Sequence, residues 1–534
     1  SFVVSGVSAA GTGAPSEAFT QSTSPGAPSG LGSEAQTTGS ITLQWTAPAE
    51  LGGDTVSEYV LYMDDGGGES AAVSTEAYRG ELSSSVLVEG LVGGRSYKFA
   101  VSAVSASGEG DRSEVMAQST APAAPGAAPV SVSQTASSIE LSWTAPSVST
   151  GLGATGYRVF DAVTSAVVYD GAGLLATEAV VSGLESGRLY SYVVSALSGS
   201  GEGDVSGTLE VSTAPGVVTG VSSTLQTSSS ITLQWEAPVV FANGSAVSGY
   251  KVYERAVHTL TDLMSIFGVS AEVLDHFLDP AESDMVVDTL VFDGRGSTGV
   301  STVLSGLSGG VEYTYVVGAV SSAGEGERSA AVAVSTSPAA PTGLLNMASQ
   351  TDGIDLVWSA PVVSTGSAVT GYIVYRNDGA GGALLSTVAC DGTGSTALAC
   401  SASGLSGGQE YVFAVSALSL AGEGDRSSTL AVSTSPAAVS GLSSDGQTTG
   451  SIDLSWDVLV ASGGSATTGY IVYRSEGAGG TDHPIVAYDG TGSTATAATV
   501  SELEGGRLYS FVVSGVSAAG TGAPSEAFTQ STSP

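Results

Sequence analysis

The chain has 534 residues, of which 51 are Asp or Glu and 14 are Lys or Arg, so its formal net charge at pH 7 is −37. This charge repels phosphate backbones and anionic lipid headgroups, and the chain has no run of about 18 apolar residues, so we expect neither nucleic acid binding nor membrane insertion. Hydrophobic residues make up 42% of the chain, which is enough for packed cores in several domains.

The first 25 residues, SFVVSGVSAAGTGAPSEAFTQSTSP, recur unchanged as residues 510–534, an offset of 510 minus 1, or 509 residues. Two independent segments would not match residue for residue. We therefore expect 509 residues to be the period of a longer repeating polymer, of which the chain is one window. In this interpretation residues 1–25 are the last two strands of a preceding copy of the repeat, and strands outside the window complete them.

Each of the five tryptophans ends a short phrase of alternating apolar and polar residues, such as SITLQW at residues 40–45. A period of two is typical of a strand with one face in a core and the other in solvent. The tryptophans lie 98, 92, 123 and 98 residues apart, which predicts five units of similar length. Turn signals between the strands indicate an all-β protein made of tandem antiparallel β-sandwiches.

These units resemble the fibronectin type III domain. The resemblance rests on the Trp of the second strand, on a third strand of the form GY.VY, and on a Leu six residues before a Tyr. It implies a tyrosine corner, in which the phenol hydroxyl bonds to backbone just upstream. The residues that it implies as structural core are Trp45, Trp143, Trp235, Trp358, Trp456, Tyr97, Tyr190, Tyr313, Tyr411 and Tyr509.

The expected domain boundaries follow the repeated STSP or STAP phrases. After the half domain at residues 1–25, we expect complete domains at residues 26–122, 123–215, 216–338, 339–436 and 437–534. Pro-containing joints between them favour extended, semi-rigid connections.

The third unit is longer than its neighbours, and we expect a short α-helical insertion over residues 257–289. Within it, TDLMSIFGVSAEVLDHFLDP has apolar residues at helical rather than strand spacing. Such a stripe either covers its own domain or contacts another chain, and we hypothesise an assembly contact once per period. The residues of that contact are Leu263, Ile266, Phe267, Leu274, Phe277 and Leu278.

Catalytic and metal-binding candidates are few. The chain has only three histidines, and no Ser or Cys nucleophile has a base at motif spacing, so we expect no enzymatic activity and no cofactor. A DGxG phrase recurs with Asp170, Asp293, Asp391 and Asp489. Asp before Gly suits a tight hairpin, and calcium binding is the alternative, although one carboxylate per turn is too few for a closed site.

Cys390 and Cys400 occur in the fourth unit alone, on either side of a predicted hairpin turn. We expect a disulfide across that hairpin, which would suit an oxidising, extracellular compartment, and a pair of buried free thiols is the alternative. The sequon NGS at Asn243 predicts an N-glycosylation site in a loop between strands.

These features together predict a structural repeat unit of a long extracellular filament or surface appendage. The alternatives are a spacer stalk of a cell-surface adhesin or receptor, and accessory modules of a secreted glycan-degrading enzyme. We expect an extracellular or cell-surface location. The expected partners are further copies of the chain or another filament protein, with glycans as a further candidate.

Overall fold

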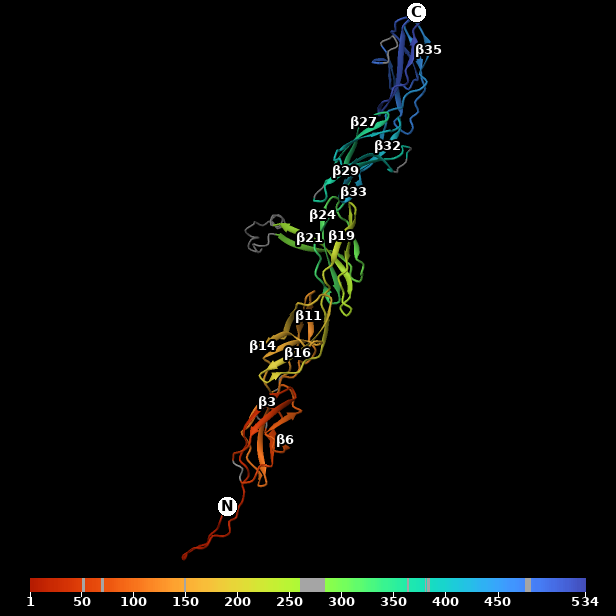
Figure 1. The fold of residues 1–534 in the computed structure, drawn as a ribbon. Coiled ribbons are helices and arrows are strands. Elements are labelled where there is room, and N and C mark those ends of the chain that lie inside the picture. The colour runs from red at the N-terminus through yellow and green to blue at the C-terminus, as the bar shows by residue number, and fades with distance from the viewer. Residues whose placement is uncertain are drawn as a thin grey trace, which may run out of the picture.

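The computed structural model describes residues 1–49, 53–68, 72–147, 150–259, 284–362, 365–379, 381, 385–475 and 482–534. The described part of the chain is all-β and contains no helix. Its domains follow one another as an elongated array, and the N- and C-termini lie at opposite ends of it (Figure 1).

Each of the five domains is a sandwich of a three-stranded and a five-stranded antiparallel sheet. In the first domain the small sheet has the order β3-β4-β7, and the large sheet has the order β10-β8-β5-β6 with β9 paired to β8. The strands of this domain are β3 (Ser29–Gln36), β4 (Ser40–Thr46), β5 (Glu58–Met63), β6 (Thr75–Gly80), β7 (Ser85–Glu89), β8 (Ser96–Ser105), β9 (Gly108–Glu109) and β10 (Met116–Ser119).

The other four domains repeat this plan. The second contains β11 (Val130–Gln134), β12 (Ser138–Ser142), β13 (Gly156–Asp161), β14 (Val167–Ala172), β15 (Glu178–Ser182), β16 (Leu189–Ser198), β17 (Gly201–Glu202) and β18 (Leu209–Ser212). The third contains β19 (Thr219–Gln226), β20 (Ser230–Glu236), β21 (Val247–Thr259), β22 (Asp284–Asp293), β23 (Ser301–Ser305), β24 (Glu312–Ser321), β25 (Gly324–Glu325) and β26 (Val332–Ser335). The fourth contains β27 (Thr342–Ser349), β28 (Gly353–Ser359), β29 (Val369–Arg376), β30 (Thr387–Thr393), β31 (Ala399–Ser403), β32 (Glu410–Ser419), β33 (Gly422–Arg426) and β34 (Leu430–Ser433). The fifth contains β35 (Ser443–Gln447), β36 (Ile452–Ser455), β37 (Thr467–Arg474), β38 (Ile485–Thr491), β39 (Ala497–Val500), β40 (Leu508–Ser517), β41 (Gly520–Thr521) and β42 (Phe528–Ser531).

The alternating phrases of the sequence form the inner strands of the small sheets. On β4, Ile41, Leu43 and Trp45 are at most 5% exposed, while the residues between them face outward. The indole of Trp45 packs edge-on against Tyr59 of the opposite sheet, with ring centroids 5.4 Å apart. Each domain has a separate cluster of buried residues of this kind, so each has the core that it needs to fold independently.

The repeated Leu and Tyr pairs close the end of each sandwich. In the first domain the backbone N–H of Val92 donates to the hydroxyl of Tyr97 at 2.9 Å, and Leu91 is buried. The same bond, at 2.8 to 2.9 Å, reaches Tyr190, Tyr313, Tyr411 and Tyr509. The tyrosine corner that the resemblance implies is therefore present in every domain.

The third domain departs from the others in the length of one hairpin. Strand β21 has 13 residues and β22 has 10, and their antiparallel register runs out to Thr259 and Asp284. Beyond Glu254, β21 pairs only with β22, so the two strands form a ribbon that projects sideways from the array (Figure 1). We call this ribbon, residues 255–259 and 284–288, the arm.

The arm shows that both ends of the predicted helical insertion are β-strands. Residues 257–259 and 284–289 fall within the predicted helical insertion, but they continue the ladder of a β-hairpin, so the prediction is wrong for them. The reason is that each strand offers the other a complete set of backbone partners, which outweighs a weak local preference. The two predicted helical stretches, with all six residues of the hypothesised assembly contact, lie outside the described residues.

Candidate functional site

The most regular feature of the array is the contact between consecutive domains, which we call the joint. At every joint a glycine shortly after β8, β16, β24, β32 or β40 lies against the carbonyl oxygen of the proline that ends the preceding segment. A Cβ at any of these glycines would overlap that oxygen. The pairs are Gly110 with Pro25, Gly203 with Pro122, Gly326 with Pro215, Gly424 with Pro338, and Gly522 with Pro436.

A backbone hydrogen bond connects domains at three joints. The N–H of Gly151 in the second domain donates to the carbonyl of Gly94 in the first at 3.0 Å. Gly366 donates in the same way to Gly310 at 3.0 Å, and Gly464 to Gly408 at 3.3 Å. The accepting glycines all have positive φ, between 69° and 74°, which points their carbonyls toward the next domain.

Small hydroxyl side chains add further bonds across the later joints. Ser337 donates to the carbonyl of Ala421 at 2.8 Å, and Ser435 donates to that of Ala519 at 3.0 Å. The N–H of Ala523 donates to the hydroxyl of Thr351 at 2.8 Å. Several independent contacts thus hold each of these joints, and bending one of them requires that they break together.

The joint between the second and third domains is built differently. Ala214 stands where Ser337 and Ser435 stand later in the chain, and Ala136 stands where the first and fourth domains have Thr38 and Thr351. Among the described residues, Gly187 and Gly244 do not share the backbone hydrogen bond that is present at the other three joints between complete domains. Instead Phe241 lies 5.8 Å from the Arg188 guanidinium. This joint keeps the glycine–proline contact but has fewer directional bonds.

A network of charged groups holds the base of the arm. Arg255 donates two hydrogen bonds to Asp288, at 2.7 and 2.8 Å, and Arg328 donates to the same carboxylate at 2.7 Å. The bonds from Arg255 and then from Arg328 lower the pKa of Asp288 from 3.8 to about 2. The Arg328 guanidinium also stacks on Tyr253, 3.5 Å from the ring centroid. The direction in which the arm leaves the sheet is therefore fixed at its root.

The same stacking occurs without an arm in two other domains. In the first domain Arg112 lies 3.4 Å from the ring centroid of Tyr62, whose hydroxyl donates to Glu109 at 2.8 Å. In the fourth domain Arg426 lies 3.6 Å from the centroid of Tyr375. The arm of the third domain is thus an addition to an Arg–Tyr contact that three of the five domains share.

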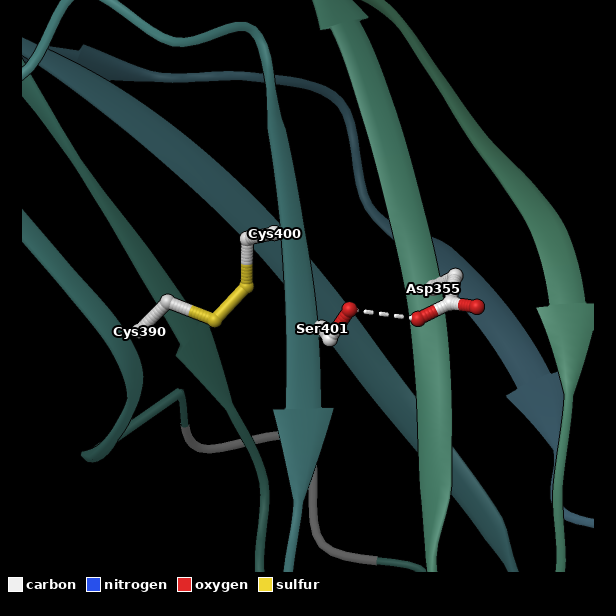
Figure 2. Close-up of a disulfide and its surroundings, with 4 residues drawn as sticks. All are labelled: Asp355, Cys390, Cys400 and Ser401. Atoms are coloured by element: carbon white, nitrogen blue, oxygen red, sulfur yellow. Dashed lines mark hydrogen bonds between the residues drawn. A yellow bond between two sulfur atoms is a disulfide. The ribbon is translucent and has the colours of Figure 1, made fainter.

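The two cysteines form a disulfide, as expected, but not across a single ladder. Cys390 is on β30 of the large sheet, Cys400 is on β31 of the small sheet, and their Cα atoms are 6.5 Å apart. Figure 2 shows the bond spanning the open edge between the two sheets, while Ser401 points away from it and bonds to Asp355 at 2.6 Å. The disulfide therefore joins the two sheets of the fourth sandwich covalently. Disulfides persist in oxidising compartments, which fits the expected extracellular location.

The hairpin aspartates are used by the turns themselves. Asp391 accepts from the N–H and the hydroxyl of Thr393, at 3.0 and 2.6 Å, and these bonds lower the pKa of the Asp391 carboxyl. Asp489 is held in the same way by Thr491. In the described part of the chain, no group of three or more His, Cys, Asp or Glu side chains converges as a metal site would require.

One Ser and His pair comes together that sequence spacing does not reveal. His483 Nε2 lies 2.9 Å from the hydroxyl of Ser510, but Ser510 is only 3% exposed. A buried hydroxyl cannot meet a substrate, so this contact is structural. Of the other histidines, His258 lies on the arm and His276 lies outside the described residues.

The predicted glycosylation residue, Asn243, is exposed and lies in the loop between β20 and β21. Its neighbour Gly244 faces the carbonyl of Gly187 across the joint. Glycosylation of Asn243 stays a prediction.

None of the described residues forms a helix long and apolar enough to cross a membrane.

The catalytic and binding motifs of the sequence do not point to the joint residues. The joint glycines end a GEG phrase that recurs in the first four domains and becomes GTG at Gly520–Gly522 in the fifth, and the second glycine is the one that meets the proline carbonyl. Both glycines of the phrase are constant across all five copies, and only the first has a positive φ that explains it. A residue that stays Gly where its neighbours vary indicates close approach of another backbone.

Comparison with protein families matches the description "Fibronectin type III domain" to five ranges that together cover most of the chain. The ranges are residues 26–119, 123–212, 214–335, 339–433 and 437–531. All of these matches are to non-catalytic modules, and no catalytic domain is evident in this chain.

Among curated proteins, Chitinase A1 of Niallia circulans is 33% identical over 220 residues, which is 39% of this chain and 24% of that protein. Receptor-type tyrosine-protein phosphatase F of Danio rerio is 28% identical over 63% of this chain and 17% of that protein. The chain thus spans less than a quarter of the length of these relatives. Among solved structures, the chicken CNTN1 FN1-FN3 domains match at 21% identity with a TM-score of 0.22, covering 59% of this chain and 99% of that one.

Proposed function

Because the chain belongs to the fibronectin type III family, as a tandem array of five domains, we propose that it is a semi-rigid structural spacer. The observation that supports this function best is the joint. The same glycine meets the same proline carbonyl at every one, and further bonds stiffen the joints on either side of the fourth domain. Domains joined by flexible linkers have no need of such repeated contacts.

Stiffness follows from the short reach of these contacts. A glycine packed on a carbonyl leaves no room for side-chain rearrangement, so rotation about the joint pushes backbone into backbone. Strands of some nine residues make each sandwich about 30 Å long, and five of them extend to roughly 150 Å. The array would set a fixed distance between whatever is attached to its two ends.

We propose that this spacer is the repeat unit of a long extracellular filament or surface appendage. The 509-residue period supports a polymeric protein, and the Cys390–Cys400 disulfide supports an extracellular location. Its partners in such a filament are further copies of itself or another filament protein. A cell-surface stalk would use the same stiffness, and electron micrographs of the native material distinguish a continuous filament from a stalk with a terminal domain.

A second candidate is an accessory stalk of a secreted glycan-degrading enzyme. The observation that favours it is the match of 220 residues to a protein named Chitinase A1. A catalytic domain elsewhere in the full-length protein would support this function over the filament.

The stiffness proposal is tested by Gly424→Val, which places a side chain against the carbonyl of Pro338 near the middle of the array. If the joint bends by about 60°, an array of about 150 Å shortens by roughly 20 Å. Small-angle X-ray scattering of the full chain measures this maximum dimension. The control is Gly13→Val, the same position in the exposed first segment, where a Cβ meets only the carbonyl of Gly6 at 3.5 Å.

Calorimetry on both variants separates a bent joint from an unfolded domain. We expect the fourth domain of Gly424→Val to unfold near its original temperature. An unchanged maximum dimension would contradict the proposal that this contact sets the angle between domains.

A further inference from the structure

The joint between the second and third domains lacks the hydrogen bonds that fix its neighbours. In the part of the chain that the structure describes, no hydrogen bond or ion pair connects these two domains. Across the next joint, by contrast, the N–H of Glu312 donates to the hydroxyl of Thr365 at 3.1 Å, in addition to the bonds described above. The N–H of Ser367 donates to the hydroxyl of Ser335 at 3.1 Å. The second and third domains therefore meet by packing alone.

The loop between β20 and β21 explains the missing backbone bond. Gly244 lies nine residues after Trp235, whereas the corresponding glycine lies eight residues after the Trp in the second, fourth and fifth domains. The longer loop closes a turn of its own, in which the N–H of Gly244 donates to the carbonyl of Phe241 at 3.0 Å. In the other three domains the corresponding N–H donates across the joint. Here it is used inside the loop, although Gly244 still lies close to the carbonyl of Gly187.

The linker at this joint is less restricted than the linkers on either side of it. Gly216 follows the last proline of the second domain, where both neighbouring linkers have alanine. Two residues later, Val218 stands where those linkers have a second proline, Pro125 or Pro341. Glycine has more backbone conformations open to it than alanine, and proline fixes its own φ. The linker between the second and third domains therefore allows a wider range of angles.

An open groove at this joint leaves room for the two domains to rotate toward each other. Val239 on its wall is 79% exposed, and Phe241 is 39% exposed. Closing the groove would bury apolar surface of both side chains against the second domain, which favours a bent arrangement. The groove has a volume of about 380 Å³ and is lined by Glu185, Ser186, Gly216, Val217, Pro238, Val239 and Phe241.

We propose that the joint between the second and third domains is the hinge of the array, and that it bends toward this groove while the other joints between complete domains hold their angles. The inference rests on the proposed spacer function and refines it. The array then consists of two stiff segments, of about 60 Å and about 90 Å, that meet at one preferred bend. Such a spacer changes the distance between its ends without unfolding a domain.

The experiment measures distance distributions between pairs of spin labels on the full chain by double electron–electron resonance. Val132, Thr224 and Met347 are exposed and occupy the same position on the first strand of the second, third and fourth domains. Each is replaced by Cys for labelling, and the native disulfide leaves no other free thiol among the described residues. Labels at 132 and 224 span the proposed hinge, whereas labels at 224 and 347 span the next joint. We expect the first distribution to be about twice as wide as the second.

Two variants restore the missing contacts at the hinge. Deleting Phe241 gives the loop the length that it has in the other domains, and Ala214→Ser supplies the hydroxyl that Ser337 uses at the next joint. Together these changes should narrow the hinge distribution to the width found at the next joint. Ala214→Ser with Ala136→Thr leaves the loop length unchanged, so it tests the same idea if the deletion disturbs folding, and it should narrow the distribution in part.

Equal widths at the two joints overturn the hinge. If both distributions are narrow, the stiff spacer stands and only the hinge fails, whereas two broad distributions overturn the spacer as well. A hinge distribution that neither variant narrows also overturns the proposal, because the missing bonds would then not be what permits bending. The scattering test of Gly424→Val concerns another joint, so either proposal can fail alone.

Discussion

The fourth and fifth domains close the same gap between their two sheets in different ways. In the fourth, Cys390 is the partner of Val374 and Cys400 is the partner of Leu356, and the disulfide spans the edge. In the fifth, the equivalent positions hold Tyr488 and Ala498, and both pack against the core. The other three domains also have an aromatic ring at the first position: Tyr78, Tyr169 and Phe292.

The difference shows that the repeat requires the gap to be filled, and not any particular residue. A ring fills it by apolar contact, and two small sulfur-containing side chains fill it by a covalent bond. The fold tolerates either because the backbone register around the gap is the same in both domains.

The largest effect is expected when the fourth domain loses its bond without gaining a ring. Replacing Cys390 and Cys400 by Ser should lower the stability of that domain by about 3 kcal/mol, the value that chain entropy gives for a loop of this size. Urea unfolding should show an earlier transition for one domain and no change for the fifth. Equal stability of the variant and the oxidised protein would mean that the disulfide does not stabilise the fourth domain.

A ring should recover part of this loss. Cys390→Tyr with Cys400→Ala gives the fourth domain the residues of the fifth, and we expect it to be more stable than the double Ser variant by about 1 to 2 kcal/mol. The same urea experiment measures the difference. If the variant with Tyr and Ala is no more stable than the variant with two Ser residues, the gap between the sheets is not equivalent in the fourth and fifth domains.

The reverse exchange tests the comparison from the other side. Tyr488→Cys with Ala498→Cys should form a disulfide in the fifth domain, with a net gain of about 1 kcal/mol because the bond replaces a ring. Mass spectrometry without reduction detects the bond, and each single Cys variant is the control. Two free thiols in the folded double variant would contradict the shared geometry.

The smallest effect is expected where two copies differ by one oxygen atom. Tyr192 and Tyr315 occupy the core position of Phe413 and Phe511, and burial raises the pKa of both phenols. Within the described residues their hydroxyls have no hydrogen-bond partner. Tyr192→Phe should therefore raise the stability of the second domain by about 1 kcal/mol, measured by thermal unfolding. Phe413→Tyr should lower the stability of the fourth domain by a similar amount. A loss of stability in Tyr192→Phe, or a gain in Phe413→Tyr, would show that the unpaired buried hydroxyl is not destabilising.

Much of the fold could be predicted from particular residues. Alternation around each Trp identified the inner strands, and the Leu and Tyr pairs identified the corners, because period and turn chemistry are local properties of the chain. The disulfide was predicted from two isolated cysteines, but its position between sheets was not, since spacing alone does not tell which sheet a strand joins. The arm was misassigned for the same reason: the apolar spacing of residues 257–289 was considered without their strand partners.

The sequence by itself determined how residues 1–25 and 510–534 pair, since identical strings form the same hairpin register at both ends of the chain. Only the tertiary structure decided that Phe511 is fully buried in the core of the fifth domain, and that a Cβ at Gly522 would overlap the carbonyl of Pro436. Strand pairing depends on backbone groups a few residues away. Burial and close approach depend on which distant segment lies opposite, and a repeated string cannot specify that by itself.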